Sequence, residues 1–240
     1  MSPIALTLVG STGLTGASAL QHLLASPTAF ALTALSRRAD AHQPTNKETS
    51  YTNRVVPDLS GVAAAPEPLV ASGGVYVTAL GTTRAQAGGV KQQEEIDLVL
   101  NRELATRAKK DGASTIIVVS STGADANSYF AYPRIKGQLE EDVKGLGFDR
   151  TVILRPATLL YSGDRAEKRT TEGWFVSLIK GARAVGLPTG ALGIDVEDVG
   201  AAIAQLAANP PDGVSTLYDG DLVKLAAEFR ASQPQPAADK

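Results

Sequence analysis

The hydrophobic positions of this chain form short apolar runs that alternate with segments in which apolar residues recur at helical spacing. The short runs predict buried β-strands, and the periodic segments predict amphipathic helices. Strands are expected at 4–9, 31–35, 53–56, 74–80, 114–119, 151–154 and 214–218. Helices are expected at 15–25, 94–110, 132–144, 173–182 and 196–208.

This alternation predicts the fold class. Strands separated by helices are typical of βαβ units with right-handed crossovers, so we expect an α/β fold with a doubly wound parallel sheet. In the 94–110 helix the buried stripe is expected to consist of Ile96, Leu100, Leu104 and Ala108. The 85–93 segment is expected to be a loop, and the Ala- and Pro-rich 62–69 segment an irregular cover of the sheet.

The chain length fits one domain. We expect a single domain over 1–231, with a small irregular region on the substrate side that lies mainly in 157–231. The last residues, 232–240, are polar and Pro-rich, which predicts a mobile tail.

Three glycines spaced three residues apart, Gly10, Gly13 and Gly16, follow the first strand and open the first helix. A glycine turn at a helix N-terminus presents backbone N–H groups and a favourable dipole to a phosphate. We therefore expect the loop to bind a pyrophosphate, and the alternative is an ordinary turn rich in small residues. The expected contacts are Gly10, Ser11, Thr12, Gly13, Leu14, Thr15 and Gly16.

Arg37 and Arg38 follow the second strand, where a site for NAD usually has an acidic residue for the ribose 2′-hydroxyl. Two guanidinium groups suit a 2′-phosphate instead, which favours NADP(H) over a solvated basic pair. Asp58 is expected to accept a hydrogen bond from the adenine amino group, with Leu59 packed against the base. The alternative for Asp58 is an N-cap.

Polar residues also follow the later strands. The fourth strand ends in Leu80, Gly81, Thr82 and Thr83, the fifth in Ser120, Ser121 and Thr122, and the sixth in Pro156. The carboxyl ends of parallel strands are where ligands bind in open sheets, so these residues are expected to lie along the cofactor.

Tyr132 and Lys136 are four residues apart and share one helix face. A lysine ammonium beside a tyrosine stabilises the phenolate, so Tyr132 can give a proton to a substrate oxygen while Lys136 also holds a ribose hydroxyl. A serine or threonine after the fifth strand would bind that oxygen, and Ser120, Ser121 and Thr122 all remain candidates. The alternative for the Tyr–Lys pair is chance spacing on a solvated face. Pro133 fits a first helical turn and favours extended backbone angles at Tyr132.

Composition excludes several other functions. Basic and acidic residues nearly balance, at a formal net charge of −2, which gives no sign of nucleic-acid binding. With no cysteine and two histidines, a metal site and a Ser–His triad are both disfavoured. No leader and no membrane span are predicted, so we expect a cytoplasmic location.

Several stretches resemble the short-chain dehydrogenase/reductase superfamily, and within it an atypical Rossmann branch. They are 79–84, 118–125, 132–137 and 153–156, with 148–150 and 173–174 also similar. The branch contains a Tat-interacting protein and a fungal protein associated with the mitochondrial outer membrane. The resemblance implies pyrophosphate on the glycine loop, a 2′-phosphate on Arg37 and Arg38, nicotinamide along the stretch after the fourth strand, and peripheral mitochondrial association as a further possibility.

The resemblance also implies that Ser121, Tyr132 and Lys136 carry the chemistry. Our interpretation is an NADP(H)-dependent oxidoreductase that reduces a carbonyl or conjugated alkene of a small molecule. The alternatives are a cofactor-binding sensor or interaction protein without hydride transfer, and a relative recruited to isomerase or cyclase chemistry. A monomer and a homodimer are both compatible with the sequence. The substrate lining is expected to come from Tyr129, Phe130, Leu159, Tyr161, Trp174, Phe175 and Leu178.

Overall fold

The computed structural model describes residues 2–161 and 193–234. The predicted helix at 173–182 and the three lining residues Trp174, Phe175 and Leu178 lie outside these ranges, as do residues 235–240 of the predicted tail.

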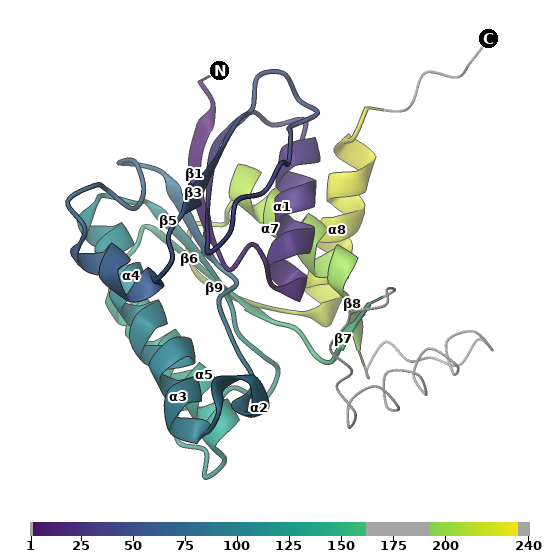
Figure 1. Cartoon of the computed structure of the whole chain (residues 1–240). Coiled ribbons are helices and arrows are strands. Elements are labelled where there is room, and N and C mark those ends of the chain that lie inside the picture. Colours follow the sequence, from purple (N-terminus) through teal and green to yellow (C-terminus); the bar gives the residue numbers. More distant parts are fainter. Residues whose placement is uncertain (1, 162–192, 235–240) are drawn as a thin grey trace.

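A parallel sheet of seven strands forms the centre of the molecule, in the order β3-β2-β1-β4-β5-β6-β9 (Figure 1). The strands are β1 Ile4–Val9, β2 Phe30–Ser36, β3 Ser50–Val55, β4 Val75–Thr78, β5 Thr115–Val119, β6 Arg150–Arg155 and β9 Gly213–Tyr218. The strand order runs outward in one direction from β1 and in the other from β4. The order therefore reverses between β1 and β4, and ligands bind at the carboxyl ends of the strands at such a switch point. The predicted doubly wound α/β fold is confirmed.

Helices cover both faces of the sheet (Figure 1). On one face, α1 Leu14–Ala25, α7 Val196–Ala208 and α8 Asp219–Ser232 bury their apolar sides against residues such as Leu8 and Val152. On the other face, α4 Asn101–Lys110 and α5 Ala131–Gly145 pack against Tyr76, Ile116 and Val118. The sheet thus lies between two apolar layers, and this packing keeps the carboxyl ends of the strands in fixed positions.

Three segments differ from the sequence predictions. The expected loop at 85–93 is wrong, because α2 Arg84–Ala87 and α3 Val90–Glu94 are helical there. The 62–69 segment begins in the 3₁₀ helix η1 Leu59–Ala64, capped by Asp58. The C-terminal helix α8 was not predicted, and it ends at Ser232, where the tail was expected to begin. A small second sheet pairs β7 Leu159–Leu160 with β8 Ile194–Asp195.

The long helix after β4 contains a π-turn, η2 Glu95–Leu100, between α3 and α4. A π-turn inserts an extra residue, so a buried stripe cannot keep one spacing through it. Leu104 and Ala108 are buried as predicted, but Ile96 and Leu100 are only half-buried, and Leu98 is buried in their place. The same shift carries the side chain of Asp97 fully into the protein.

Candidate functional site

The glycine loop between β1 and α1 packs tightly against its own backbone and against the backbone of Ala79. Gly10 has a left-handed backbone (φ +87°), and a Cβ there would lie 2.6 Å from the backbone of Ala79. A Cβ on Gly16 would lie 2.0 Å from the carbonyl oxygen of Gly10. These two glycines are therefore required by the packing of the chain against itself, whether or not a ligand is bound.

Gly13 has a different position. It is the N-cap of α1 with ordinary backbone angles (φ −76°), and it supplies no side-chain cap. A Cβ built on it meets only the Gly10 carbonyl oxygen at 3.3 Å and the Ala79 carbonyl oxygen at 4.0 Å. The N–H groups of the first turn of a helix have no partner within the helix. Gly13 thus leaves the start of α1 uncovered at the carboxyl end of β1.

This arrangement fits a dinucleotide pyrophosphate. The amides at the start of α1 and the helix dipole favour an anion. The hydroxyl of Ser11 is buried without a hydrogen-bond partner among the described residues, so it is a donor that the chain itself leaves unused. The remaining predicted contacts are Thr12, Leu14 and Thr15, and they lie in or directly beside this turn.

Arg37 and Arg38 lie exposed at the carboxyl end of β2. Hydrogen bonds from side chains on β2 and β3 fix the turn that carries them. The hydroxyl of Ser36 donates to the carbonyl of Arg38, and the amide of Asn53 donates to Ser36 Oγ (3.0 Å) and to Asp40 (2.6 Å). The two arginines thus follow a fixed turn at the carboxyl end of β2, with their side chains exposed to solvent.

Asp40 is the acceptor at the centre of that anchor. Burial raises its pKa, but hydrogen bonds from Tyr51 and the backbone of His42, together with the His42 charge, outweigh burial, and the net pKa is lowered. Burial and the bond to Asp40 raise the pKa of Tyr51 to about 12. Asp40 is therefore an ionised acceptor at neutral pH, engaged by β3 and by His42.

Asp58 caps η1. Its carboxylate accepts the backbone N–H of Ser60 (3.0 Å) and the Ser60 hydroxyl, and these bonds lower its pKa. This is the capping arrangement that the sequence left as the alternative, and its role toward adenine stays a prediction. Leu59 packs partly against the buried cluster under α4.

The loop after β4 is held by the helix that follows it. The N–H of Thr82 donates to Asp97 Oδ1 (2.7 Å), and the hydroxyl of Thr83 caps α2 by accepting from Gln86 N (3.3 Å). Asn101 donates to the Leu80 carbonyl (3.3 Å). Sequence reasoning missed Asp97 and Asn101, because polar residues four apart on a helix normally indicate a solvated face.

The three hydroxyl residues after β5 are not equivalent. The hydroxyl of Ser120 is buried and donates to the carboxylate of Glu140. The hydroxyl of Thr122 donates to the Arg155 carbonyl (2.7 Å). That of Ser121 donates only to the neighbouring Thr122 carbonyl, at a long 3.3 Å, from a half-buried position. Ser121 therefore has the hydroxyl least committed to the protein.

Tyr132 and Lys136 lie in the first two turns of α5. Helix α5 begins at Ala131 with Phe130 as N-cap, so Tyr132 is helical and the expected extended conformation is wrong. Pro133 costs no hydrogen bond, because first-turn N–H groups lack helical partners. Tyr132 is 43% exposed, whereas Lys136 is only 5% exposed, and its Nζ lies 3.5 Å from the Val119 carbonyl.

Glu140, one turn after Lys136, completes the inner side of α5. It is 1% exposed and accepts two hydrogen bonds from Arg155 on β6, from Nε (3.0 Å) and Nη2 (2.6 Å). These bonds raise the pKa of Arg155. Arg155 also donates to the Tyr218 hydroxyl (3.1 Å). This pair cannot be predicted from the sequence pattern, since its members are 15 residues apart on different elements.

The predicted substrate lining is only partly placed. Tyr129 is 99% and Phe130 77% exposed, so within the described residues their side chains face solvent. Leu159 lies half-buried in β7, and Tyr161 is half-buried just beyond it. Pro156 is buried, and its carbonyl accepts from Thr122 N (2.9 Å), which ties the ends of β5 and β6 together.

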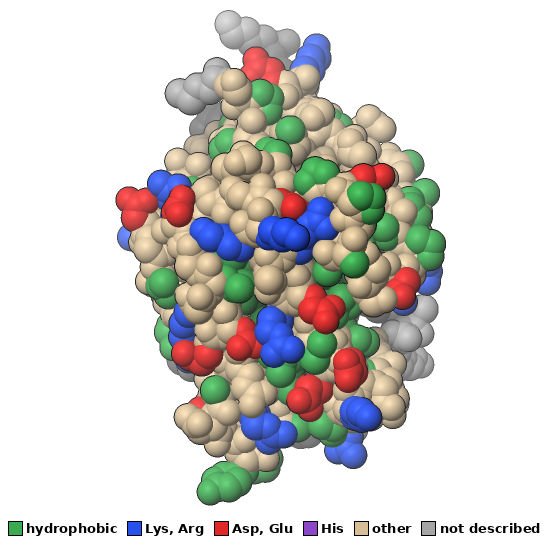
Figure 2. Space-filling model, turned by 90° about the vertical axis from the view of Figure 1, so that its left-hand side faces the viewer, with side chains coloured by type: hydrophobic (Ala, Val, Ile, Leu, Met, Phe, Trp, Pro, Cys, Tyr) green, Lys and Arg blue, Asp and Glu red, His purple; other side chains and the backbone are tan. Residues whose placement is uncertain are grey.

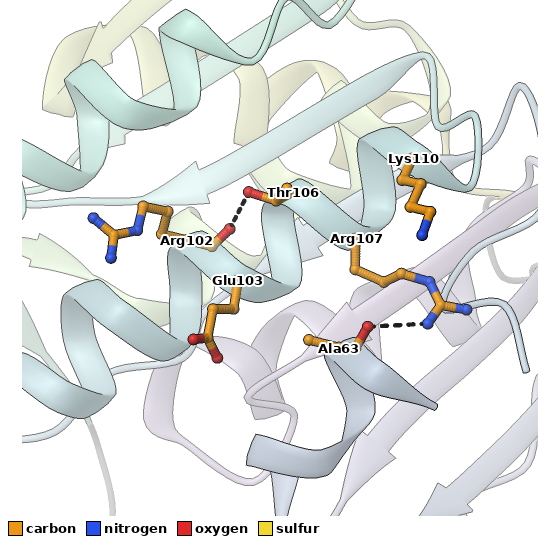
Figure 3. Close-up of a pocket in the computed structure, with 6 residues that line it drawn as sticks. All are labelled: Ala63, Arg102, Glu103, Thr106, Arg107 and Lys110. Atoms are coloured by element: carbon orange, nitrogen blue, oxygen red, sulfur yellow. Dashed lines mark hydrogen bonds between the residues drawn. The ribbon is translucent and has the colours of Figure 1, made fainter. Parts of the chain in front are cut away.

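A separate hollow of about 280 Å³ lies against the outer side of α4, next to η1 (Figure 3). Its lining residues are Ala63, Arg102, Glu103, Thr106, Arg107 and Lys110. Arg107 is committed to Asp111 (2.8 Å) and to the carbonyls of Ala63 and Glu67. No predicted site residue lines this hollow. Figure 2 shows this side of the molecule with basic and acidic side chains interspersed.

Comparison with known proteins decides the family. A family model described as NAD(P)H-binding matches residues 10–210. The chain belongs to the NAD(P)H-binding family. It is 38% identical to the protein fmp52, mitochondrial, of Aspergillus fumigatus over 230 residues, which is 92% of this chain and 97% of that protein. FMP52 of Candida albicans is 36% identical, over 91% of this chain and 96% of its own length.

The NAD(P)H-binding family also accounts for the fold. The structure of MoeE5 in complex with UDP-glucose and NAD superposes with a TM-score of 0.62 at 15% identity, covering 94% of this chain and 82% of MoeE5. Agreement at this identity concerns the fold alone. The predicted Rossmann-type family resemblance is confirmed. Among residues 2–161 and 193–234, no helix has the length and apolar character needed to cross a bilayer.

Proposed function

We propose that this protein is an NADP(H)-dependent oxidoreductase that reduces a carbonyl or a conjugated alkene of a small molecule. The observation that carries the proposal is the buried Lys136, whose Nζ lies at the end of β5 next to Gly81, with Tyr132 one turn earlier on the same helix. A lysine that is only 5% exposed is costly to bury, and buried ionisable groups of this kind cluster at functional sites.

The roles follow from these positions. When bound, the cofactor supplies a hydride. Tyr132 gives its phenolic proton to the substrate oxygen, and the Lys136 ammonium stabilises the phenolate that results. Ser121 donates a hydrogen bond to the same oxygen, and we choose it over Ser120 and Thr122 because their hydroxyls are committed to Glu140 and Arg155. Gly10–Gly16 and the loop after β4 hold the two halves of the cofactor.

NADP(H) rather than NAD(H) is supported by Arg37 and Arg38. Both side chains are exposed at the end of β2, and the nearby carboxylate, Asp40, is engaged by Tyr51 (2.7 Å) and Asn53 (2.6 Å). A carboxylate so engaged is less available for a ribose 2′-hydroxyl, whereas free guanidinium groups suit a 2′-phosphate.

The experiment compares Tyr132→Phe with wild type on a panel of carbonyls and enones, with NADPH oxidation and NADPH affinity both measured. We expect turnover to fall by roughly 100- to 10,000-fold, as for loss of a general acid, with NADPH affinity unchanged. Tyr76→Phe makes the same chemical change in the buried part of β4 and should retain turnover. Full turnover by Tyr132→Phe contradicts the mechanism, and tight NADPH binding without any oxidation favours the sensor.

We further propose association with mitochondria. Two relatives that cover nearly the whole chain are named mitochondrial, which supports this location, whereas the expected cytoplasmic location has no such support. The measurement is fractionation of cells that express the tagged chain, followed by protease treatment of intact mitochondria. A tag found only in the soluble fraction contradicts the proposal.

A further inference from the structure

A fully buried carboxylate, Asp97, lies beside the proposed site but has no part in the proposed chemistry. It is 0% exposed and belongs to the π-turn between α3 and α4. Single π-turns inside α-helices occur frequently at functional sites. A buried charged group is expensive unless it is paired and hydrogen-bonded, so its contacts should explain why the position is acidic.

Asp97 fixes the loop after β4 by a hydrogen bond. Its Oδ1 accepts the N–H of Thr82 at 2.7 Å. Gln93, one turn earlier, donates its amide to the Thr82 carbonyl (3.2 Å) and reaches Asp97 Oδ2 (3.5 Å). Both backbone groups of Thr82 are therefore fixed by one helix face, and the loop that should run along the nicotinamide is held from behind.

Asp97 also faces the ammonium of Lys136 across Gly81. A Cβ built on Gly81 would lie 3.5 Å from Lys136 Nζ and 3.8 Å from Asp97 Oδ1, so the two charges flank this glycine at no more than about 7 Å. Among the described residues, Lys136 Nζ donates one long hydrogen bond, to the Val119 carbonyl at 3.5 Å. Asp97 is thus the carboxylate placed to balance a buried cation.

The other ionisable side chains near Lys136 in the described residues do not serve this purpose. Tyr132 and Glu140 lie one turn before and after it on α5. Glu140 is paired with Arg155 on β6, at 2.6 Å. Burial raises the pKa of Asp97, and the Lys136 charge and the Thr82 N–H oppose that rise only in part, so the net pKa is raised. An asparagine could accept the same Thr82 N–H without a charge, so the hydrogen bond to the loop does not by itself require a carboxylate.

We propose that Asp97 is a positioning residue that fixes the Leu80–Thr83 loop and holds the Lys136 ammonium in place for Tyr132. This inference rests on the proposed function for its catalytic consequence, but the pairing of Asp97 with Lys136 is a property of the free protein.

The first test is Asp97→Asn, which keeps an acceptor for Thr82 and removes the charge. We expect kcat to fall at least tenfold while KM and NADPH affinity stay within about threefold, because the Lys136 ammonium loses the carboxylate that holds it in place for Tyr132. Asp111→Asn, at the C-cap of α4, is the matched control. Asp111 also accepts a backbone N–H, from Leu69 (2.6 Å), and pairs with Arg107, so its loss should lower stability and leave kcat unchanged. A wild-type kcat in Asp97→Asn overturns the proposal.

A second test needs no turnover and does not depend on the folding of Asp97→Asn. In Lys136→Met, the carboxyl carbon signal of Asp97, followed by NMR, should titrate at higher pH than in the wild type. An unmoved titration overturns the pairing. If Tyr132→Phe leaves turnover intact while the Asp97 titration moves, the proposed function fails and the pairing stands.

Discussion

Gly13 and Gly16 of the first loop should respond differently to substitution by alanine. The difference separates an effect on folding from an effect on cofactor binding. A methyl group on Gly16 would lie 2.0 Å from the Gly10 carbonyl oxygen and 2.6 Å from its carbonyl carbon. The loop or α1 must move by more than 1 Å to relieve the overlap. Such overpacking costs about 3 kcal/mol, and the higher helix propensity of alanine offsets about 1 kcal/mol. The net loss of about 2 kcal/mol should lower Tm by roughly 4–8 °C in a chain of this size.

Gly13→Ala has the opposite balance. Its backbone angles suit any residue, and its Cβ lies 3.3 Å from the nearest atom, so the chain accommodates it with a small adjustment. Stability should fall by about 1 kcal/mol or less, the difference between glycine and alanine at an N-cap. The methyl group would, however, stand between α1 and a bound phosphate. Loss of one charge-assisted hydrogen bond, about 1.5–3 kcal/mol, weakens NADPH binding by roughly 10- to 150-fold.

The assay pairs thermal unfolding without cofactor with a fluorescence titration of NADPH for both variants. Gly61→Ala is a suitable control, because a Cβ there meets nothing within 4 Å. If Gly13→Ala binds NADPH as tightly as the wild type, the start of α1 does not hold the pyrophosphate. If Gly16→Ala is as stable as the wild type, the packing argument is wrong.

Two further predictions concern charged side chains. Glu140→Gln leaves the half-buried Arg155 without its carboxylate and should lower the free energy of unfolding by about 1.5–3 kcal/mol in a urea titration. A loss below about 1 kcal/mol would show that the pair behaves as a surface salt bridge. Replacing Arg37 and Arg38 together by alanine should weaken NADPH binding by roughly 10- to 100-fold and leave NADH binding unchanged. An equal loss for both cofactors would remove the argument for a 2′-phosphate site.

The sequence was sufficient to predict the sheet and most helices. Its five inner strands are mostly buried and appear as apolar runs. The edge strands β3 and β9 are half-exposed and more polar. Helix α7 has the bounds that the sequence predicts. The segment after β4 is harder to predict from sequence. Gly88 and Gly89 between two short helices suggested a continuous loop, yet left-handed glycine simply ends α2 there.

The site could be predicted only where its residues are close in sequence or follow strand ends. The glycine loop, the two arginines and the Tyr–Lys pair belong to this class. Asp97 and Glu140 do not, because their meaning depends on partners contributed by other elements, Lys136 and Arg155 respectively. A polar side chain on an amphipathic helix gives no signal in sequence that tertiary packing will bury it.

The π-turn at Glu95–Leu100 has a consequence for how the long helix can change during evolution. One inserted residue rotates everything before it by about 100° relative to everything after it. The residues before and after the turn therefore face in different directions. Gln93 faces the loop after β4, whereas Leu104 and Ala108 face the sheet. A deletion of one residue within the turn would leave Leu104 and Ala108 in the core while swinging Gln93 away from Thr82. Substitutions on either side of the turn can accordingly alter the loop or the core without a compensating change in the other.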